Sequence, residues 1–197
     1  MSATTRRIDR ADILSNADFD AIRKQRKPAL IALKKHRRVQ VGPQATFYFE
    51  NYETMWWQIQ EMLRIEKGGE TQIGDELAAY NPLVPQGSEL VATLMFEVDD
   101  PVQRAAFLNS LGGVEETVTI SVAGETIRAV PETEVERTTE AGKTSALHFL
   151  HFPFSAAQIS AFRDPARPAL LGIGHANYGH IAVLAGAVRA ALALDFA

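Results

Sequence analysis

Two histidines stand three residues apart in the stretch K-T-S-A-L-H-F-L-H-F-P-F, which spans residues 143–154. Imidazoles bind metals and carry protons near neutral pH, and joint ligation needs both rings on one face. Residues i and i+3 share a face on a helix but point to opposite sides of a strand. The aromatic residues and the closing proline favour a strand. We therefore predict that His148 and His151 do not share a metal.

A second polar cluster lies in the glycine-rich segment G-I-G-H-A-N-Y-G-H, residues 172–180. Glycines permit close backbone approach, and imidazoles there could bind a metal or shuttle a proton. The polar side chains of this segment are His175, Asn177, Tyr178 and His180. A plain glycine-rich turn between two strands is the competing interpretation.

The position of His175 depends on how the neighbouring strands connect. A strand at 144–153, a helix at 155–163 and a strand at 169–175 could form a parallel crossover, because the connection has the required length. Both strands would then end at one edge of the sheet, with His151 near His175. In an antiparallel arrangement His175 would lie nearer the start of the first strand.

The helix predicted from Tyr52 to Lys67 carries two carboxylates of interest, Glu61 and Glu66. Glu66 interrupts the apolar face, and a buried carboxylate needs a cation, a metal or a proton. Arg26 and Arg37, which fall on the apolar stripe of the preceding helix, are candidate partners.

Trp57 lies on the side of that helix opposite its apolar face. An amphipathic helix that exposes this side to solvent would not be expected to carry a tryptophan there. Either the helix is buried on two sides, or its second side meets another chain. A non-catalytic homodimeric scaffold is one function class that follows from the second alternative.

Composition excludes several kinds of chemistry. The chain has no cysteine, so it has no disulfide, no thiolate nucleophile and no cysteine-ligated cluster. The glycine-rich phosphate loop, the dinucleotide-binding turn, the nucleophile elbow and the His-Glu-x-x-His helix are all absent from the sequence. No set of nucleophile, base and orienting residue is recognisable, so the sequence leaves open whether the protein is an enzyme.

The charge is divided unevenly along the chain. Residues 1–40 carry a net charge of +7 and the remainder −11, within an overall charge of −4. A basic helix over residues 23–38 could bind nucleic acid, but few aromatic residues interleave with its basic ones. A basic helix lying on its own acidic domain is the favoured interpretation, and nucleic-acid binding ranks as the alternative.

The periodicities predict an α+β fold, a mostly antiparallel sheet packed by helices and preceded by a basic N-terminal helix. We expect a single domain over residues 1–197, with a basic helical segment at 1–40 and an α+β body at 41–197. The start of the chain lacks a signal-peptide pattern, and no segment is long and apolar enough to span a bilayer. A cytoplasmic location without membrane association is expected.

Three stretches together resemble a bacterial family of unknown function: Q-I-Q-E-M-L-R-I-E (58–66), E-L-A-A-Y-N-P-L-V-P-Q-G-S-E-L-V-A-T-L-M-F-E (76–97) and K-T-S-A-L-H-F-L-H-F (143–152). The similarity runs from the basic helix to the C-terminus. Members of that family are often encoded beside rubrerythrin-like proteins and iron–sulfur oxidoreductases. The resemblance therefore implies an accessory role in redox or metal metabolism, with such proteins as partners.

The family pattern has histidines at the positions of His148 and His175. It commonly has arginine where this chain has His151, and it has no regular histidine at 180, so neither of these two is carried forward as a metal ligand. The expected function is a ligand- or metal-binding accessory protein. The candidate ligands for a divalent metal are Glu66, His148 and His175. The candidate ligand-binding residues are Gln58, Glu61, Arg64, Asn81 and Tyr178.

Overall fold

A computed structural model describes residues 6–132 and 143–197, in which helices and strands are interspersed along the chain. The helices are α1 (Asn16–Lys35), α2 (Tyr52–Glu66), α3 (Gly69–Tyr80), α4 (Pro101–Asn109), α5 (Ala156–Arg163) and α6 (Gly186–Leu192). The strands are β1 (Arg38–Val41), β2 (Ala45–Phe49), β3 (Glu89–Phe96), β4 (Val118–Val122), β5 (Glu125–Arg128), β6 (Val130–Pro131), β7 (Leu147–Pro153), β8 (Ala169–His175) and β9 (Tyr178–Val183). The predicted α+β class is confirmed.

The strands form two antiparallel sheets, one of five strands in the order β1-β2-β3-β7-β6 and one of four in the order β5-β4-β8-β9. Along β3, Leu90, Ala92 and Leu94 face the second sheet, while Val91 and Thr93 face away from it. This period of two is what a strand with two differently covered faces requires. The five-stranded sheet therefore has an inner face on the second sheet and an outer face toward the helices.

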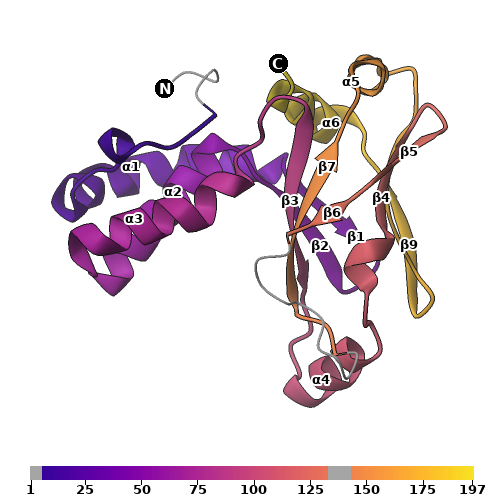
Figure 1. Cartoon of the computed structure of the whole chain (residues 1–197), viewed down its shortest axis with the longest axis horizontal. Coiled ribbons are helices and arrows are strands. Elements are labelled where there is room, and N and C mark those ends of the chain that lie inside the picture. The colour runs from indigo at the N-terminus through magenta and orange to yellow at the C-terminus, as the bar shows by residue number, and fades with distance from the viewer. Residues whose placement is uncertain (1–5, 133–142) are drawn as a thin grey trace.

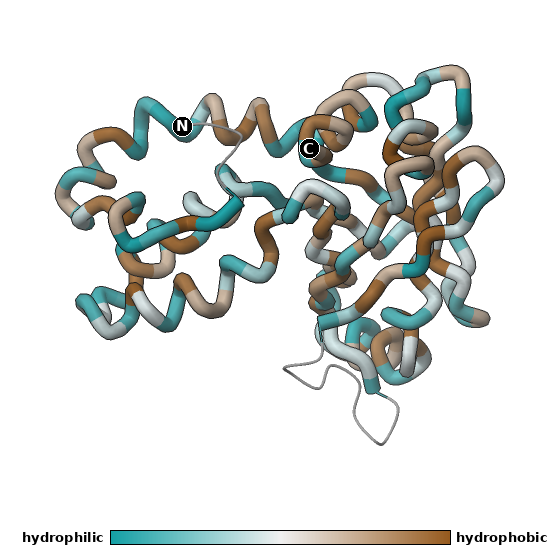
Figure 2. The backbone as a smooth tube through the Cα atoms, turned by 45° about the horizontal axis from the view of Figure 1, so that its top comes forward, coloured by the Kyte–Doolittle hydropathy of each residue, from teal (hydrophilic) through white to brown (hydrophobic). Residues whose placement is uncertain are grey.

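The inner faces of the two sheets enclose one apolar core, to which β1 to β5 and β7 to β9 all contribute. Strand β1 lies beside β9, and β5 lies beside β7, so the two sheets approach each other at both edges. Figure 2 shows hydrophobic residues concentrated along the strands, whereas the helices alternate between hydrophobic and hydrophilic residues. The sandwich thus holds its two sheets together by a shared apolar core, without a disulfide.

The crossover alternative for residues 144–175 is wrong. Strand β7 belongs to the five-stranded sheet and β8 to the other, where β8 pairs antiparallel with β4 and β9. Helix α5 therefore carries the chain from one sheet to the other instead of returning it to the same sheet. Within the segment 172–180, β8 and β9 form a hairpin, so the competing interpretation of a turn between strands is confirmed.

Helices α1, α2 and α3 lie together on one side of the sandwich (Figure 1). Together with the N-terminal segment they form a second apolar cluster. This cluster includes Val91 on the outer face of the five-stranded sheet. Ring edges of Trp56 and Trp57 meet Phe19 of α1, with centroids 5.9 and 5.2 Å apart. Trp57 is buried, so α2 is covered on two sides within the chain and Trp57 gives no support to a dimer. No helix of the described residues is long and apolar enough to cross a membrane.

The basic helix lies on acidic groups of its own chain. In α1, Arg23 pairs with Glu61 at 2.7 Å and Arg26 pairs with Glu53 at 3.6 Å. Arg26 also stacks over the Trp56 ring, 4.7 Å from its centroid. The helix runs unbroken through Pro28, and the Ser15 hydroxyl caps its N-terminus by accepting a hydrogen bond from the backbone of Asp18. The structure therefore has the arrangement favoured above, in which the basic helix lies on acidic groups of its own chain.

Arg37 connects the helices to the sandwich. Its buried guanidinium donates to the carbonyls of Phe49 and Glu50, each at 2.9 Å, and pairs with the carboxylate of Asp195. Burial raises the pKa of Asp195, while the adjacent Arg37 opposes this shift. Arg37 was a candidate partner for the carboxylates of α2, but in the structure its acidic partner is Asp195.

The β1–β2 turn is held by a tyrosine from β9. The Tyr178 hydroxyl accepts hydrogen bonds from the backbone of Gln44 and Ala45, at 2.9 and 3.0 Å, and donates to the carbonyl of Val41 at 2.9 Å. Gly42 in this turn has φ +72°, and a Cβ there would lie 2.6 Å from both Tyr178 and His180. The turn therefore requires glycine for its backbone and for its packing.

On the outer face of the five-stranded sheet, Glu97 collects three donors. Its carboxylate accepts from the hydroxyls of Thr46 at 2.6 Å and Tyr48 at 2.8 Å, and it pairs with Arg38 at 3.3 Å. The Thr46 hydrogen bond first, then Tyr48 and Arg38, lower the pKa of Glu97. The exposed carboxylate of Glu97 is thus stabilised in its charged form by two hydroxyl donors and by the guanidinium of Arg38.

Replacing Gly42 with alanine should destabilise the protein more than the same change at Gly124. Both glycines have positive φ, which costs alanine about 1–2 kcal/mol. Only Gly42 also faces atoms within contact distance, which adds roughly 1–3 kcal/mol of overpacking. Urea unfolding of Gly42→Ala and Gly124→Ala measures the difference, and equal losses in the two variants would contradict this account of the turn.

The contribution of Glu97 to stability should depend on pH. Because the folded-state pKa is lowered, the stabilisation is present above the unfolded value of about 4.3 and is lost as the pH falls through the folded pKa. The stability difference between wild type and Glu97→Gln should therefore be modest at pH 7 and shrink below about pH 4. Chemical unfolding at pH 3, 5 and 7 measures it, and a difference that grows on acidification would be the opposite result.

Candidate functional site

A cavity of about 340 Å³ lies between the outer face of the five-stranded sheet and the helices. Its sheet wall comes from β2, β3 and β7, and its helical wall from α1, α2 and the end of α3. The lining residues are Lys34, Arg37, Tyr48, Phe49, Glu50, Thr54, Met55, Gln58, Tyr80, Leu83, Thr93, Met95, Leu147 and Phe149. Small-molecule sites are typically concave, mostly apolar and supplied with a few polar groups, and this cavity has that composition.

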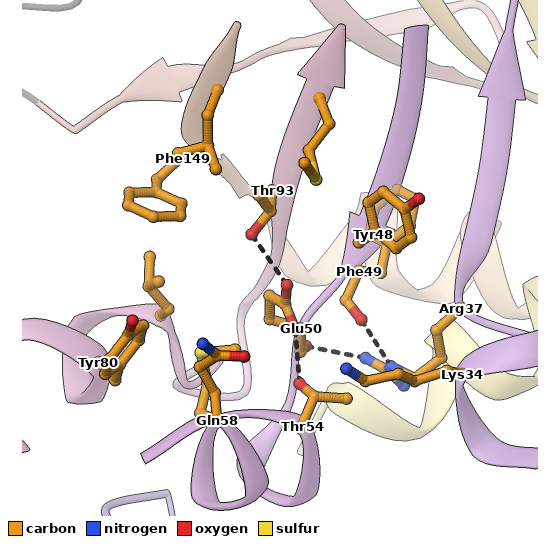
Figure 3. Close-up of a pocket in the computed structure, with 14 residues that line it drawn as sticks. Lys34, Arg37, Tyr48, Phe49, Glu50, Thr54, Gln58, Tyr80, Thr93 and Phe149 are labelled. Atoms are coloured by element: carbon orange, nitrogen blue, oxygen red, sulfur yellow. Dashed lines mark hydrogen bonds between the residues drawn. The ribbon is translucent and has the colours of Figure 1, made fainter. Parts of the chain in front are cut away.

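Glu50 supplies the carboxylate of the cavity (Figure 3). It follows β2 directly and is only 8% exposed. One carboxylate oxygen accepts from the Thr54 hydroxyl of α2 at 2.6 Å, and the other accepts from the Thr93 hydroxyl of β3 at 2.8 Å. Three elements therefore meet at this one side chain.

The position of Glu50 follows from the local sequence. Strand β2 alternates, so Tyr48 faces the outer side of the sheet and Phe49 the inner core. The next helix begins immediately, because the Asn51 side chain accepts from the Thr54 backbone N–H and the Thr54 hydroxyl accepts from the Asn51 backbone N–H. Thr54 is thereby fixed beside the Glu50 carboxylate.

No cation of residues 6–132 or 143–197 is paired with the Glu50 carboxylate. Arg37 donates to the carbonyl of Glu50, not to its carboxylate, and its charge is matched by Asp195. Lys34 lines the cavity from α1 but is exposed to solvent. Within residues 6–132 and 143–197, the Glu50 carboxylate forms no ion pair, and its hydrogen bonds come from two neutral hydroxyls.

The opposite wall of the cavity is aromatic. Figure 3 shows the rings of Tyr80 and Phe149 across the cavity from Lys34 and Arg37, with Gln58 below them. Burial raises the pKa of the Tyr80 hydroxyl, against a smaller opposing effect of a hydrogen bond with Gln58. Tyr80 is therefore a neutral hydroxyl at physiological pH, able to donate or accept a hydrogen bond.

Of the five predicted ligand-binding residues, Gln58 alone lines this cavity. Glu61 pairs with Arg23 and Arg64 with Asp20, so both hold α2 against α1. The Asn81 amide bonds to both the backbone N–H and the carbonyl of Ile8, which fixes the N-terminal segment. The Tyr178 hydroxyl is used by the β1–β2 turn.

The three predicted metal ligands lie in different parts of the fold. Glu66 is exposed at the end of α2, where Gln72 donates to it at 2.8 Å. His148 is buried on the inner face of β7, with its Nε2 3.0 Å from the Thr144 hydroxyl and its Nδ1 3.9 Å from Glu115. His175 lies at the end of β8, where its Nδ1 accepts from the backbone of Asn177. No group of three or more His, Asp and Glu side chains suited to a metal occurs in the described part of the chain.

The two histidines of β7 face opposite ways, as the strand geometry predicts. His148 is opposite Leu94 in the core, whereas His151 is opposite Val91 on the outer face and bonds to Glu89 at 2.9 Å. Each has a polar partner of its own within the fold, so neither depends on the other.

Sequence reasoning did not identify Glu50, Thr93 or Tyr80 as site residues. A signal existed in A-T-F-Y-F-E (45–50), because the charged residue ends an alternating strand just before a helix cap. Thr93 likewise interrupts an apolar run in β3. Neither pattern shows that the two side chains meet, because 43 residues separate them.

Comparison with known proteins gives a family and a closely similar structure. A crystal structure of a novel protein of unknown function from Burkholderia pseudomallei K96243 has a TM-score of 0.89 and 37% sequence identity, covering 96% of this chain and 99% of that one. No protein with a curated description matches the chain. The model of the family described as "Protein of unknown function (DUF3501)" matches residues 7–196. The chain therefore belongs to the DUF3501 family, a bacterial family of unknown function.

Proposed function

We propose that this protein binds a small organic molecule in the cavity bordered by Glu50. The observation that carries the proposal is a buried carboxylate, held by two threonine hydroxyls, on the wall of a cavity of about 340 Å³. That volume is at the lower end of the range of about 300–1,000 Å³ for small-molecule sites. Apolar and aromatic walls with a few fixed polar groups are the usual composition of such sites.

A purely structural role explains Glu50 less well. Burying a carboxylate is costly even when it is hydrogen-bonded, and a well-packed apolar side chain could join the same elements at lower cost. Glu61, a carboxylate that holds α2 against α1, is paired with Arg23. Glu50 instead borders open space and is held in a fixed orientation, which is how binding sites present polar groups.

The accessory role in redox or metal metabolism rests on the family resemblance, and the site geometry adds no support to its metal version. Glu66, His148 and His175 lie in separate places, and the cavity contributes one carboxylate. The nucleic-acid alternative loses force because Arg23, Arg26 and Arg37 are paired within the chain. Small-molecule binding therefore ranks first.

Filling the cavity should abolish ligand binding. Met95 lines it from the outer face of β3, so Met95→Trp places a larger side chain in the space that a ligand would occupy. We expect wild-type protein, equilibrated by dialysis with a bacterial metabolite extract, to enrich specific small molecules detected by mass spectrometry. The Met95→Trp protein should lose that enrichment.

The matched control is Val183→Trp, which adds the same side chain at an exposed position of β9 in the other sheet. This variant should enrich the same molecules as wild type. Enrichment that is unaffected by Met95→Trp, or no enrichment by folded wild-type protein, would contradict the proposal. Far-ultraviolet circular dichroism establishes that each variant is folded.

A further inference from the structure

We propose that the ligand of this cavity carries a positively charged nitrogen, as an organic ammonium with an apolar body, and that Glu50 is its counter-ion. This inference rests on the proposed small-molecule function and names the chemical class that the site selects. Its premise is the combination of a buried carboxylate, an absence of any paired cation in the described residues, and adjacent open volume.

Glu50 and Glu97 make an informative pair, because each follows a strand of the same sheet and accepts from two hydroxyls. Glu97 is exposed and nevertheless has a cation, Arg38. Glu50 is buried, where an unmatched charge is far more costly, yet no cation of the described chain pairs with it. Glu50 therefore needs a counter-ion more than Glu97 does, and Glu50 is the carboxylate that faces the cavity.

The two neighbouring basic residues do not take that role. Arg37 is committed to Asp195 and to the carbonyls of Phe49 and Glu50, and its buried guanidinium is held by all three. Lys34 lines the cavity as an exposed residue of α1 and forms no ion pair with Glu50 among the described residues. Since the Arg37–Asp195 pair is neutral as a unit, the charge of Glu50 remains to be matched by a bound cation.

The walls suit an organic cation better than a metal ion. Calcium takes six to eight oxygen ligands, and magnesium demands a near-octahedral set of carboxylates, waters and phosphates, whereas this cavity offers one carboxylate between apolar and aromatic walls. An ammonium needs a single carboxylate, and its apolar body would lie against Met95, Leu147 and Phe149. The rings of Tyr80 and Phe149 add faces that attract cations (Figure 3).

The test uses probes that share a skeleton and differ only in the charge of one end. Three skeletons (n-hexyl, cyclohexylmethyl and 2-phenylethyl) each carry a primary ammonium, a hydroxyl or a carboxylate, and ligand-observed NMR titration of full-length protein gives the affinities at pH 7. A hydrogen-bonded charge pair is worth a factor of about 10–100, so the ammonium of at least one skeleton should bind that much more tightly than its alcohol. The carboxylates should bind most weakly.

Variants assign the preference to Glu50. Glu50→Gln keeps the side-chain shape but removes the charge, so ammonium and alcohol should bind that variant with similar affinity. Glu97→Gln, the matched control, should retain the wild-type preference, because Glu97 pairs with Arg38 and does not line the cavity. Lys34→Met should tighten ammonium binding a few-fold by removing a like charge. If Glu50→Gln does not fold, Thr93→Val, which removes one hydroxyl donor, should still weaken the preference.

The outcomes separate this inference from the function on which it rests. If probes bind and Met95→Trp abolishes binding, but alcohols or carboxylates bind as tightly as ammoniums, Glu50 is not a counter-ion and the inference is overturned while small-molecule binding stands. The same conclusion follows if Glu50→Gln and Glu97→Gln have equal effects. If no probe or metabolite binds in a manner sensitive to Met95→Trp, both proposals fail.

Discussion

The guanidinium of Arg37 is the interaction on which the arrangement of helices and sheets depends. It stands between α1 and β1, binds the carbonyls that end β2, and pairs with Asp195 after α6. An arginine can satisfy several acceptors from one buried plane, which a lysine cannot do. The charge pair offsets part of its own desolvation cost through these additional hydrogen bonds. One side chain thereby joins the end of α1 to the end of β2 and to the C-terminal segment.

The cavity lies beside this junction, and Arg37 is one of its lining residues. The sheet turns its outer face toward α2 and α3, and side chains close the gap at Val91 but not in front of Thr93 and Met95. Glu50 stands where the strand ends and the helix begins, so its backbone is fixed by Arg37 and its carboxylate by two hydroxyls. Because both its backbone and its carboxylate are already held, Glu50 loses little conformational entropy when a ligand binds, which favours binding.

Local patterns in the sequence were sufficient for the elements but not for the site. The aromatic residues and closing proline of β7 and the apolar face of α2 reflect near neighbours, and such patterns predicted these elements and the fold class. The division of β7 and β8 between two sheets depends on long-range packing, which no periodicity encodes. His148 attracted interest by its residue type, yet its surroundings are buried partners. Glu50 was overlooked because its significance comes from Thr93 and Arg37, not from its sequence neighbours.

The pairing of Arg37 with Asp195 joins residues 158 positions apart. During synthesis, α1 to α3 and the first strands leave the ribosome long before Asp195 is made. Until then Arg37 lacks its counter-ion. Contacts between residues so far apart in the sequence form slowly, because the chain must lose loop-closure entropy before the contact can stabilise it. Strands β8 and β9 belong to the sheet that covers the inner face of the first sheet and are also made late, so a partly made chain displays the hydrophobic inner face of β1 to β3 before the sandwich is complete.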